Sequence, residues 1–375
     1  MNQNKKILVG LSGGVDSAVT AYLLKEQWYD VTAGFMINYM APEWELCPTR
    51  EDIKVAKQVA EYLEIPFFTF DYRDEYEEKV LNYMYEGYKK GITPNPDIKC
   101  NSEIKFRVFL DEALEAWFDM VATGHYARIN PPISDHNSVP LNKGEVSDSV
   151  QGDYFKLLKW KDPNKDQSYF LAGLSQEQLS RALFPIGDLE KSEVRDIARK
   201  AWLPNAERKE SQGICFVGKV DIKEFLQKKI PNSTWEVYDT NGKLLGTHKW
   251  VFYYTIGQRK GLDIWGMPEP IFVVNKDIKN NRLIVWYGKD DELFSDTLRC
   301  DKIHFLSSPP AFFGWEGSYK SQAKIRYRQA DQDCEVHRRD SGYEIKFTEK
   351  QRAIASGQII AFYNGDELWG SSVIL

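Results

Sequence analysis

Residues 12–17, SGGVDS, combine two glycines with two serines between an apolar run and a segment of helical periodicity. Glycines tolerate positive φ and let the backbone approach an anion closely, so successive N–H groups can face one phosphate. The dipole of the following helix and the hydroxyls of Ser12 and Ser17 would add to that attraction. A simple N-cap turn would use similar residues, but the strand–turn–helix context favours a phosphate-binding loop.

The segment SGGVDS lacks the residues of two common phosphate-binding loops, which excludes both. It has no lysine, so it is not a Walker A loop, and its spacing differs from the G-x-G-x-x-G dinucleotide fingerprint. Asp16 is suitably placed to help organise Mg²⁺ beside the phosphates.

Cys100 is the first of two cysteines in settings that suggest chemistry. It follows the stiff turn residues Asn95-Pro96-Asp97 and precedes a helix whose predicted N-cap is Asn101 or Ser102. A helix N-terminus and nearby lysines, Lys105 among them, would lower the thiol pKa and favour the thiolate.

Cys215 is the second, in the segment KESQGICFVG at residues 209–218. Alone, either cysteine is more often a small buried hydrophobe. Together with a nucleotide-activating loop they suggest sulfur transfer, because a persulfide needs one cysteine and its release needs another.

Composition limits the class of protein. The chain has 375 residues, which predicts two or three domains, and its 42% hydrophobic and 28% charged residues are ordinary for a globular protein. It contains neither a run of 18 apolar residues nor a signal-type start, so we expect no membrane association. Five cysteines do not suggest a disulfide framework and favour a cytoplasmic protein.

The net charge of −6 argues only weakly against a nucleic-acid partner, because a local patch suffices. The segment KSQAKIRYRQ at 320–329 is such a patch, with four basic residues and no acid. Arg326 and Arg328 alternate with other residues as on one face of a strand. A solvated strand face is the alternative interpretation.

The first 127 residues alternate between strand and helix patterns, which predicts a doubly wound α/β domain with a parallel sheet. Ligands of such sheets bind beyond the carboxyl ends of the strands, where SGGVDS stands. The predicted strands are 5–11, 30–37, 66–72 and 119–127, and the predicted helices are 15–27, 51–64, 73–90 and 103–116.

The rest of the chain changes character. We expect a surface loop at 130–153, a hairpin of 154–160 with 167–173, and two helices up to about residue 201. Short strands and glycine-rich turns follow, predicting a small, mostly β central domain and an antiparallel, barrel-like C-terminal β domain. The predicted domains are 1–210, 211–292 and 293–375.

Motifs over nearly the whole chain resemble the bacterial tRNA-specific 2-thiouridylases, whose nucleotide site is the PP-loop of the ATP pyrophosphatases. The shared motifs are SGGVDS (12–17), TPNPDIKCN (93–101), ATGHYA (122–127), DPNKDQSYFL (162–171), SQGICF (211–216), YTIGQRKGL (254–262) and KIRYRQ (324–329). That set in that order is far more specific than the loop alone.

The resemblance implies roles for individual residues. Cys100 corresponds to the nucleophile and Cys215 to the persulfide carrier, with a transient disulfide between them, and Asp97 could act as acid or base. The implied ATP positions are Gly10, Leu11, Ser12, Gly13, Gly14, Val15, Asp16, Ser17, Met36 and Gly124. Asn95, Pro96 and Asp97 correspond to target-base positions, and the implied tRNA contacts are His125, Lys165, Asp166, Gln167, Arg326, Tyr327 and Gln358.

Two of these assignments have a purely structural alternative. His125 could be a packed core histidine, and Lys165 to Gln167 could form only a hairpin turn. The remaining cysteines, Cys47, Cys300 and Cys334, match no role and are expected to be structural or exposed.

The resemblance implies ATP and Mg²⁺ as cofactors, and tRNA with a wobble uridine and a persulfide-carrying donor protein as partners. Uridine O2 would be adenylated and then replaced by sulfur. A PP-loop amidating synthetase, another tRNA-modifying PP-loop enzyme and a non-catalytic RNA-binding module are the alternatives. An amidating enzyme would need no cysteine pair, and an RNA-binding module leaves the ATP loop unexplained.

The tryptophans raise a separate question. Trp28, Trp117 and Trp202 each follow a predicted helix, where the C′ residue usually takes the left-handed conformation. Glycine is also expected from the family resemblance at Trp160, Trp250, Trp265, Trp286 and Trp369. Our hypothesis is that many of these are glycines in the natural protein, encoded by UGA in an organism that reads UGA as glycine. Packing of each tryptophan against the sheet is the alternative.

Overall fold

A computed structural model gives the fold of the chain. It describes residues 5–40, 48–131, 154–162, 165–209, 215, 222–227, 229, 235–248, 251–262, 264, 266–267, 269–288, 290–309 and 318–375. The predicted surface loop from residue 132 to 153, Cys47, Trp250 and Trp265 lie outside these residues.

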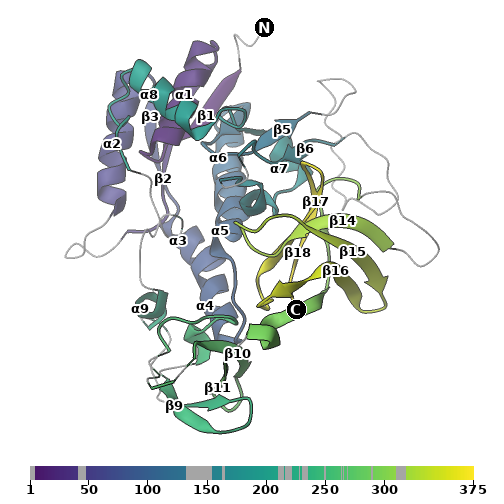
Figure 1. The fold of residues 1–375 in the computed structure, drawn as a ribbon. Coiled ribbons are helices and arrows are strands. Elements are labelled where there is room, and N and C mark those ends of the chain that lie inside the picture. The colour runs from purple at the N-terminus through teal and green to yellow at the C-terminus, as the bar shows by residue number, and fades with distance from the viewer. Residues whose placement is uncertain are drawn as a thin grey trace.

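The N-terminal domain is built on a five-stranded parallel sheet in the order β3-β2-β1-β4-β7 (Figure 1). Its strands are β1 (Lys6–Gly10), β2 (Asp30–Ile37), β3 (Phe67–Asp71), β4 (Met120–Ala122) and β7 (Ala182–Leu183). Its covering helices include α1 (Val15–Glu26), α2 (Pro48–Tyr62) and α8 (Lys191–Lys200). The predicted strand–helix alternation and parallel sheet are confirmed.

The two faces of this sheet enter different cores. On β1, Ile7 and Val9 pack into the core shared with α1, α2 and α8, whereas Leu8 packs into the core on the opposite face. Successive side chains of a strand point to opposite faces, so an apolar run such as ILV is buried on both.

Below the sheet in Figure 1, two helical runs extend toward the central region. The first consists of α3 (Arg73–Tyr76), η1 (Glu77–Leu81) and α4 (Asn82–Lys89), and the second of α5 (Pro96–Lys99), η2 (Cys100–Val108) and α6 (Phe109–Glu115). Both η1 and η2 are π-helical. Asn95 caps the second run, its side chain accepting the Ile98 N–H at 3.3 Å. The predicted cap at Asn101 or Ser102 is therefore wrong, because Asn95 and the proline after it start the helix earlier.

The predicted hairpin of 154–160 with 167–173 is also wrong. Strand β6 (Lys156–Leu158) pairs with β5 (Arg128–Asn130) and with β18 of the C-terminal sheet. Residues 168–171 form instead the 3₁₀ helix η3 (Ser168–Leu171). The two helices expected next are present as α7 (Gln176–Ser180) and α8.

The central region holds a four-stranded sheet in the order β10-β11-β8-β9. Its elements are α9 (Ile222–Gln227), β8 (Trp235–Asp239), β9 (Leu244–His248), η4 (Val251–Tyr253), β10 (Ile271–Asp277) and β11 (Arg282–Tyr287). Buried Val237 and Val273 join the same core as Leu8 of the N-terminal domain, so apolar packing is continuous between the two.

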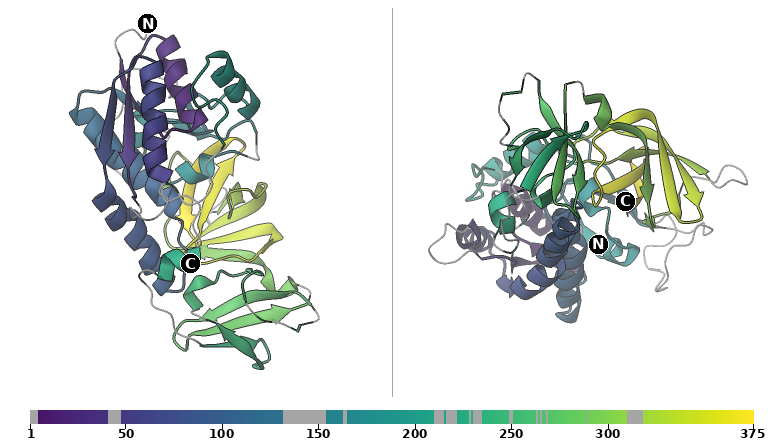
Figure 2. Two further views of the ribbon diagram at one scale, coloured as in Figure 1. Left: turned by 90° about the vertical axis from the view of Figure 1, so that its left-hand side faces the viewer. Right: turned by 90° about the horizontal axis from the view of Figure 1, so that it is seen from below.

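The C-terminal region is an antiparallel sheet in the order β12-β16-β15-β14-β17-β18, which β6 and β5 extend. Its elements are η5 (Asp290–Leu293), β12 (Phe294–Cys300), β13 (His304–Phe305), β14 (Ser318–Lys324), β15 (Gln332–Arg339), β16 (Gly342–Arg352), β17 (Ile359–Asn364) and β18 (Glu367–Val373). Strand β14 ends at Lys324, so Arg326 and Arg328 lie in a turn rather than alternating along a strand as predicted. The two views in Figure 2 show this yellow sheet beside the central region, with the parallel sheet at the far end of an elongated molecule.

Three tryptophans take the left-handed conformation predicted for them. The φ angles of Trp28, Trp117 and Trp202 are 63°, 63° and 52°. Their side chains are 75%, 84% and 81% exposed, so packing against the sheet does not explain them. Trp160 and Trp369 differ, because both are buried and their indole N–H groups donate to Leu189 O and Ser321 Oγ.

In the part of the chain that the structure describes, no helix combines the length and the apolarity needed to cross a membrane.

Candidate active site

The predicted phosphate loop lies between β1 and α1, at the carboxyl edge of the parallel sheet. The Ser17 hydroxyl donates to Gly14 O at 3.1 Å and accepts the Ser12 N–H at 3.1 Å, which closes the loop on itself. Gly14 occupies the N-cap of α1 and has no side chain to cap it. The first N–H groups of a helix have no intrahelical acceptor, so those of α1 point toward the space where an anion would bind.

Two glycines at this site leave no room for a larger residue. Gly13 has φ +78°, and a Cβ there would lie 2.7 Å from Asp52 O. Gly124, just beyond β4, would bring a Cβ within 2.8 Å of Ser17 N. These contacts explain in physical terms why glycine stands at both positions of the predicted ATP site.

Two side chains from beyond α8 fix the orientation of the loop. The amide of Asn205 donates to Gly13 O at 2.9 Å, and Arg208 donates to the same carbonyl at 3.0 Å. Arg208 also pairs with Asp52 at 2.5 Å. A carbonyl held from behind by two donors turns the opposite, N–H side of the peptide toward the ligand space.

The other predicted ATP positions line the ends of β1 and β2. The Leu11 N–H donates to Gly34 O at 2.9 Å, which continues the parallel ladder beyond Gly10. Met36 is 6% exposed, and its methyl carbon would lie 3.1 Å from a Cβ at Gly10. Gly10 therefore makes space for Met36 beside the loop.

Asp16 was predicted to help organise Mg²⁺, and the structure gives its carboxylate other partners. Its oxygens accept Lys191 Nζ at 2.6 and 2.8 Å, and one accepts the Tyr126 hydroxyl at 2.7 Å. Among the described residues, no three His, Cys, Asp or Glu side chains form a group that could hold a metal ion. The residues thus fit a Mg²⁺ that arrives on nucleotide phosphates, with one carboxylate nearby, rather than a resident ion held by the protein alone.

Cys100 and Cys215 meet although they are far apart in the chain. The Cys100 side chain hydrogen-bonds to that of Cys215. Cys215 is held through its backbone, since its N–H donates to Asp97 Oδ1 at 3.1 Å and its carbonyl accepts the Tyr76 hydroxyl at 2.7 Å. Asp97 and Cys100 lie on the same helical run, α5 and η2, which therefore positions two of these three partners of Cys215.

The two thiols differ in their ionisation. Burial raises the pKa of Cys100 well above its usual range, and its hydrogen bond to Cys215 acts in the same direction. The hydrogen bond from Cys100 lowers the pKa of Cys215 to about 7, with Lys105 contributing in the same direction. The prediction of a lowered pKa for Cys100 is therefore wrong, because Cys100 lies inside the helix and is fully buried rather than standing at an exposed N-terminus.

The loop after β4 joins the two halves of the site. Gly124 packs against the first turn of α1, while the next residue, His125, lies against the rings of Phe106 and Phe184. Burial lowers the pKa of His125 well below its usual range, and its Nδ1 lies 2.7 Å from Thr123 Oγ1. The phosphate loop and the cysteine helix thus contact consecutive residues of one loop. A direct contact of buried His125 with tRNA stays a prediction.

The predicted target-base segment is clamped by the C-terminal region. The Thr93 N–H donates to Ser356 O at 2.8 Å, and Gln358 Nε2 donates to Thr93 O at 2.8 Å. Asn95 follows as the helix cap, so the segment leading to Asp97 is held at both ends. Gln358, predicted to contact tRNA, is therefore bonded to Thr93, two residues before the predicted base-binding residue Asn95.

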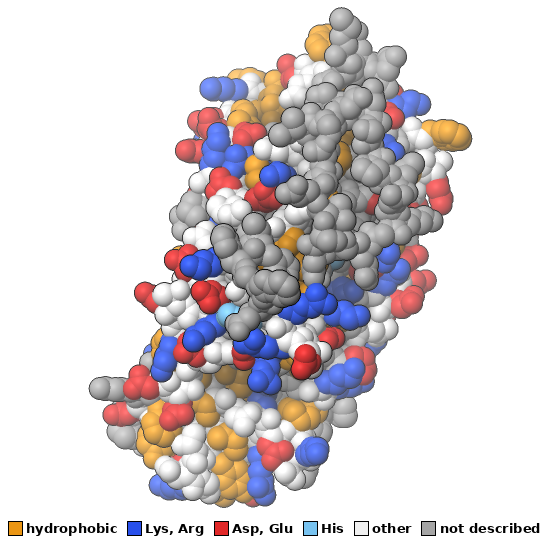
Figure 3. Space-filling view, turned by 90° about the vertical axis from the view of Figure 1, so that its right-hand side faces the viewer, with side chains coloured by type: hydrophobic (Ala, Val, Ile, Leu, Met, Phe, Trp, Pro, Cys, Tyr) orange, Lys and Arg blue, Asp and Glu red, His pale blue; other side chains and the backbone are white. Residues whose placement is uncertain are grey.

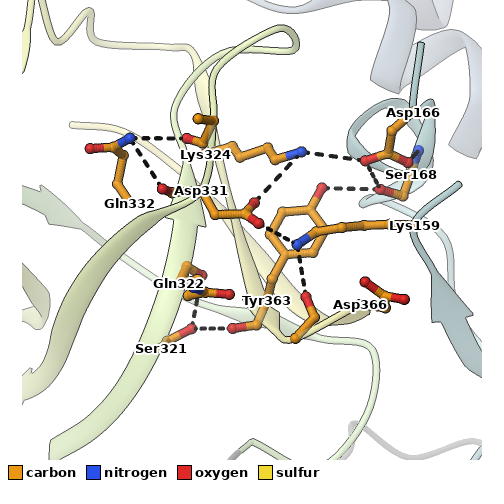
Figure 4. A network of polar contacts seen from close by, with 12 residues as sticks. Lys159, Asp166, Ser168, Ser321, Gln322, Lys324, Asp331, Gln332, Tyr363 and Asp366 are labelled. Carbon is orange, nitrogen blue, oxygen red and sulfur yellow. Dashed lines mark hydrogen bonds and ion pairs between the residues drawn. The ribbon is translucent and has the colours of Figure 1, made fainter. Parts of the chain in front are cut away.

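The side chain of Asp166, predicted to contact tRNA, points into the protein rather than toward solvent. It is 2% exposed, and its carboxylate accepts the N–H groups of Trp160 and Ser168, each at 3.1 Å. Lys324 reaches it from β14 at 3.4 Å (Figure 4). Of the predicted tRNA segment Lys165 to Gln167, Asp166 thus fixes the backbone and links it to the C-terminal sheet.

Its neighbours are more accessible. Lys165 and Gln167 are partly exposed, and Gln167 exchanges hydrogen bonds with the backbone of Tyr126, each at 2.9 Å. These bonds place the segment directly beside the loop that carries Gly124.

The turn after β14 carries two further predicted tRNA contacts, Arg326 and Tyr327. The Arg326 guanidinium donates to Ala353 O, and burial lowers its pKa from the usual range. The Tyr327 ring packs on Phe170 with 4.3 Å between ring centroids. Figure 3 shows Lys and Arg side chains gathered across the middle of the face on the C-terminal side of the molecule. Contact of Arg326 and Tyr327 with tRNA stays a prediction.

Several residues of the site were not identified from the sequence: Tyr76, Lys191, Asn205 and Arg208. Each acts on a partner more than 100 positions away in the chain, so no local motif marks it. The remaining described cysteines, Cys300 and Cys334, are buried in the C-terminal core as expected of structural residues.

The fold and the loop define a phosphate-binding α/β domain joined to two β-rich regions, and comparisons with known proteins place it more closely. Family models described as "tRNA methyl transferase HUP domain", "tRNA methyl transferase PRC-barrel domain" and "Aminomethyltransferase beta-barrel domain" match residues 5–219, 223–286 and 295–374. The tRNA-specific 2-thiouridylase MnmA of Halalkalibacterium halodurans is 44% identical, covering 99% of this chain and 95% of that protein. The tRNA-specific 2-thiouridylase MnmA 1 of Geobacillus kaustophilus is 43% identical, covering 99% and 96%.

The chain belongs to the family of bacterial tRNA-specific 2-thiouridylases. Among solved structures, the U34-tRNA thiolase NcsA of Methanococcus maripaludis matches 60% of this chain and 67% of that one, at 18% identity and a TM-score of 0.35. That structural likeness is too low to bear on function.

Proposed function

We propose that this protein makes 2-thiouridine at the wobble position of tRNA, using ATP to activate the base and a cysteine persulfide as the sulfur source. The observation that carries the proposal is the contact of Cys100 with Cys215. Cys100 lies on the helix whose Phe106 packs on His125, and the preceding residue, Gly124, packs on the first turn of α1 beside the predicted phosphate loop. We assign ATP binding and catalysis to residues 1–210, a central domain to 211–292 and tRNA contacts to 293–375.

Activation comes first, because uracil O2 is a poor leaving group. Attack of O2 on the α-phosphate of ATP forms a C2–O–AMP ester and releases pyrophosphate. In this proposal the N–H groups at the start of α1 and the Ser12 hydroxyl bind the phosphates, while the Ser17 hydroxyl holds the loop in shape through its bonds to Gly14 O and Ser12 N. Mg²⁺ bound to those phosphates would supply further neutralisation of charge, with Asp16 the nearby carboxylate.

Sulfur transfer follows at the cysteine pair. A persulfide on Cys215 attacks C2 through its terminal sulfur, and AMP departs with the former O2. The Cys100 thiol then loses its proton, for which Asp97 is the proposed acceptor, and attacks the Cys215 sulfur, breaking the S–S bond, so that the terminal sulfur stays on C2 and a Cys100–Cys215 disulfide forms. Cys100 can alternatively release hydrosulfide first, with the same balance. An external thiol reduces the disulfide before the next turnover.

Asp97 is suited to handle protons in this sequence. Burial raises the pKa of its carboxyl group, and a carboxyl group whose pKa is shifted by its site is a candidate for acid–base catalysis. It already accepts the Cys215 N–H, so a change in its ionisation is felt directly at the persulfide carrier.

The proposal includes partners that the chain would need. A protein carrying a persulfide supplies sulfur to Cys215, and tRNA binds across the C-terminal region with its target base near Asn95, Pro96 and Asp97. A cytoplasmic location is part of the proposal, since both ATP and tRNA are found there.

The test is thiolation in vitro. Unmodified tRNA is incubated with the protein, Mg-ATP and a persulfide donor, then digested, and 2-thiouridine is measured by mass spectrometry. Cys100→Ser and Cys215→Ser should each abolish the product, whereas the control Cys47→Ser should retain nearly full activity. Full activity of Cys215→Ser would end the persulfide mechanism. AMP release without a thiolated nucleoside would favour the amidating alternative.

A further inference from the structure

Lys105 lies beside the cysteine pair but has no role in the mechanism described above. It comes five residues after Cys100 in η2, which is π-helical. In a π-helix the backbone hydrogen bond joins residues i and i+5, so Cys100 and Lys105 stand one turn apart on the same side. π-helical turns of this kind often occur at functional sites.

The side chain of Lys105 reaches the sulfur of Cys215, to which it hydrogen-bonds. Cys215 thereby receives two donors, the Cys100 thiol and the Lys105 ammonium. Its backbone is fixed at the same time by Asp97 and Tyr76, at 3.1 and 2.7 Å. The sulfur is thus held in place by its main chain and faced by donors from η2.

The groups around the Cys215 sulfur differ in whether their neutral or their charged form is favoured. The titratable groups that the structure describes around it are Cys100, Lys105, Asp97 and Tyr76, with His125 near Lys105. Burial favours the neutral forms of Cys100, Tyr76 and His125. Lys105 is partly buried, and its ammonium is stabilised by adjacent anions. The Asp97 carboxylate acts on it through charge alone, whereas the Cys215 sulfur both acts through charge and accepts its hydrogen bond.

We propose that Lys105 is the counter-ion of the Cys215 sulfur, holding its thiolate and persulfide in the anionic form. This agrees with the proposed role of Cys215 as the cysteine that receives the persulfide sulfur. Cys100 stays a protonated hydrogen-bond donor until it attacks the Cys215 sulfur. The role in persulfide chemistry rests on the proposed function, but the pairing of Lys105 with the Cys215 thiolate does not.

The test measures the thiolate directly, without tRNA or ATP. The full-length protein is alkylated with iodoacetamide over a series of pH values, and the modified Cys215 peptide is quantified by mass spectrometry. The midpoint of labelling should lie near pH 7 in the unaltered protein, in line with the lowered pKa of this thiol. In Lys105→Met it should rise by about one pH unit or more, the size expected for loss of an adjacent opposite charge.

Two variants separate charge from structure. Lys105→Arg keeps the charge and should keep the midpoint, whereas Lys105→Gln, which tests the same loss of charge if Lys105→Met does not fold, should raise it. Lys99→Met is the matched control, since Lys99 lies on the same helical run but pairs with Glu103 at 3.2 Å. An unchanged midpoint in the folded Met and Gln variants, or an equal rise in Lys99→Met, would overturn the proposal. Loss of thiolation with a normal midpoint would instead concern the proposed function alone.

Discussion

The three exposed tryptophans give a prediction whose size follows from backbone geometry. Trp28, Trp117 and Trp202 each end a helix in a Schellman motif: in the first, the Trp28 N–H donates to Lys25 O at 2.9 Å and the Tyr29 N–H to Leu24 O at 3.2 Å. The C′ residue of that motif is left-handed and usually glycine. We expect Trp→Gly at each site to stabilise the protein.

The magnitude is a difference between two terms. A left-handed conformation costs a residue with a Cβ about 1–2 kcal/mol, and glycine avoids this cost. The greater freedom of glycine in the unfolded chain takes back about 0.4–1 kcal/mol. Because the side chains are 75–84% exposed, little apolar burial is lost. The net gain is about 0.5–1 kcal/mol per site, or about 2 kcal/mol for the triple variant if the sites are independent.

Urea unfolding followed by far-UV circular dichroism measures the effect as a rise in the transition midpoint. Trp→Ala at the same positions is the matched control, since it removes the indole but keeps a Cβ in the left-handed conformation. Glu64 ends α2 in the same motif with φ 51°, so Glu64→Gly should gain a similar amount. Equal gains from alanine and glycine, or a loss on Trp→Gly, would refute the backbone argument.

The genetic hypothesis has its own decisive observation. If these positions are glycines in the natural protein, the gene carries UGA at the codons for Trp28, Trp117 and Trp202, and UGG there would reject the idea. For Trp160 and Trp369 the codons are the test as well. Their indoles are buried and hydrogen-bonded, so backbone strain does not favour glycine at these two positions.

Two predictions concern ligand binding. Arg208→Met removes a donor to Gly13 O and the partner of Asp52, so ATP affinity measured by calorimetry should fall several-fold while tRNA affinity stays constant; unchanged ATP affinity would refute the loop-positioning role. Arg326→Ala should weaken tRNA binding and reduce the slope of log K against log salt by about one unit if Arg326 contacts a phosphate. ATP binding should not change in that variant, and an unaltered slope would show that Arg326 serves only its contact with the Ala353 carbonyl.

Some of the site was predictable because its signal is local. The strand, the glycine turn and the helix of the phosphate loop are consecutive, so hydrophobic pattern and glycine chemistry identify them together. The left-handed residues after α1, α6 and α8 were predicted for the same reason, since a helix end is a property of a few neighbouring residues. The resemblance to a family added the separate roles of the two cysteines and most of the predicted tRNA contacts, which pattern alone would not assign.

Other features depended on residues brought together from distant parts of the chain. Strand β6 was assigned the wrong partner because β18, its neighbour in the sheet, lies near the C-terminus. The inward-facing Asp166 has a counter-ion, Lys324 of β14, that the sequence around it does not show. Neither partner lies near these residues in the sequence.

The cysteines show the division most clearly. Their residue types and the motifs around them, read in sequence, pointed to sulfur chemistry, but the lowered pKa expected for Cys100 was wrong, because burial raises it. Cys100 is fully buried and donates to Cys215, and Lys105 faces the sulfur of Cys215. Local backbone preference is encoded in consecutive residues, whereas burial, charge and hydrogen-bond partners depend on which distant segments pack together. Sequence therefore determined which groups are available, and tertiary structure decided how deeply each sulfur is buried and which groups face it.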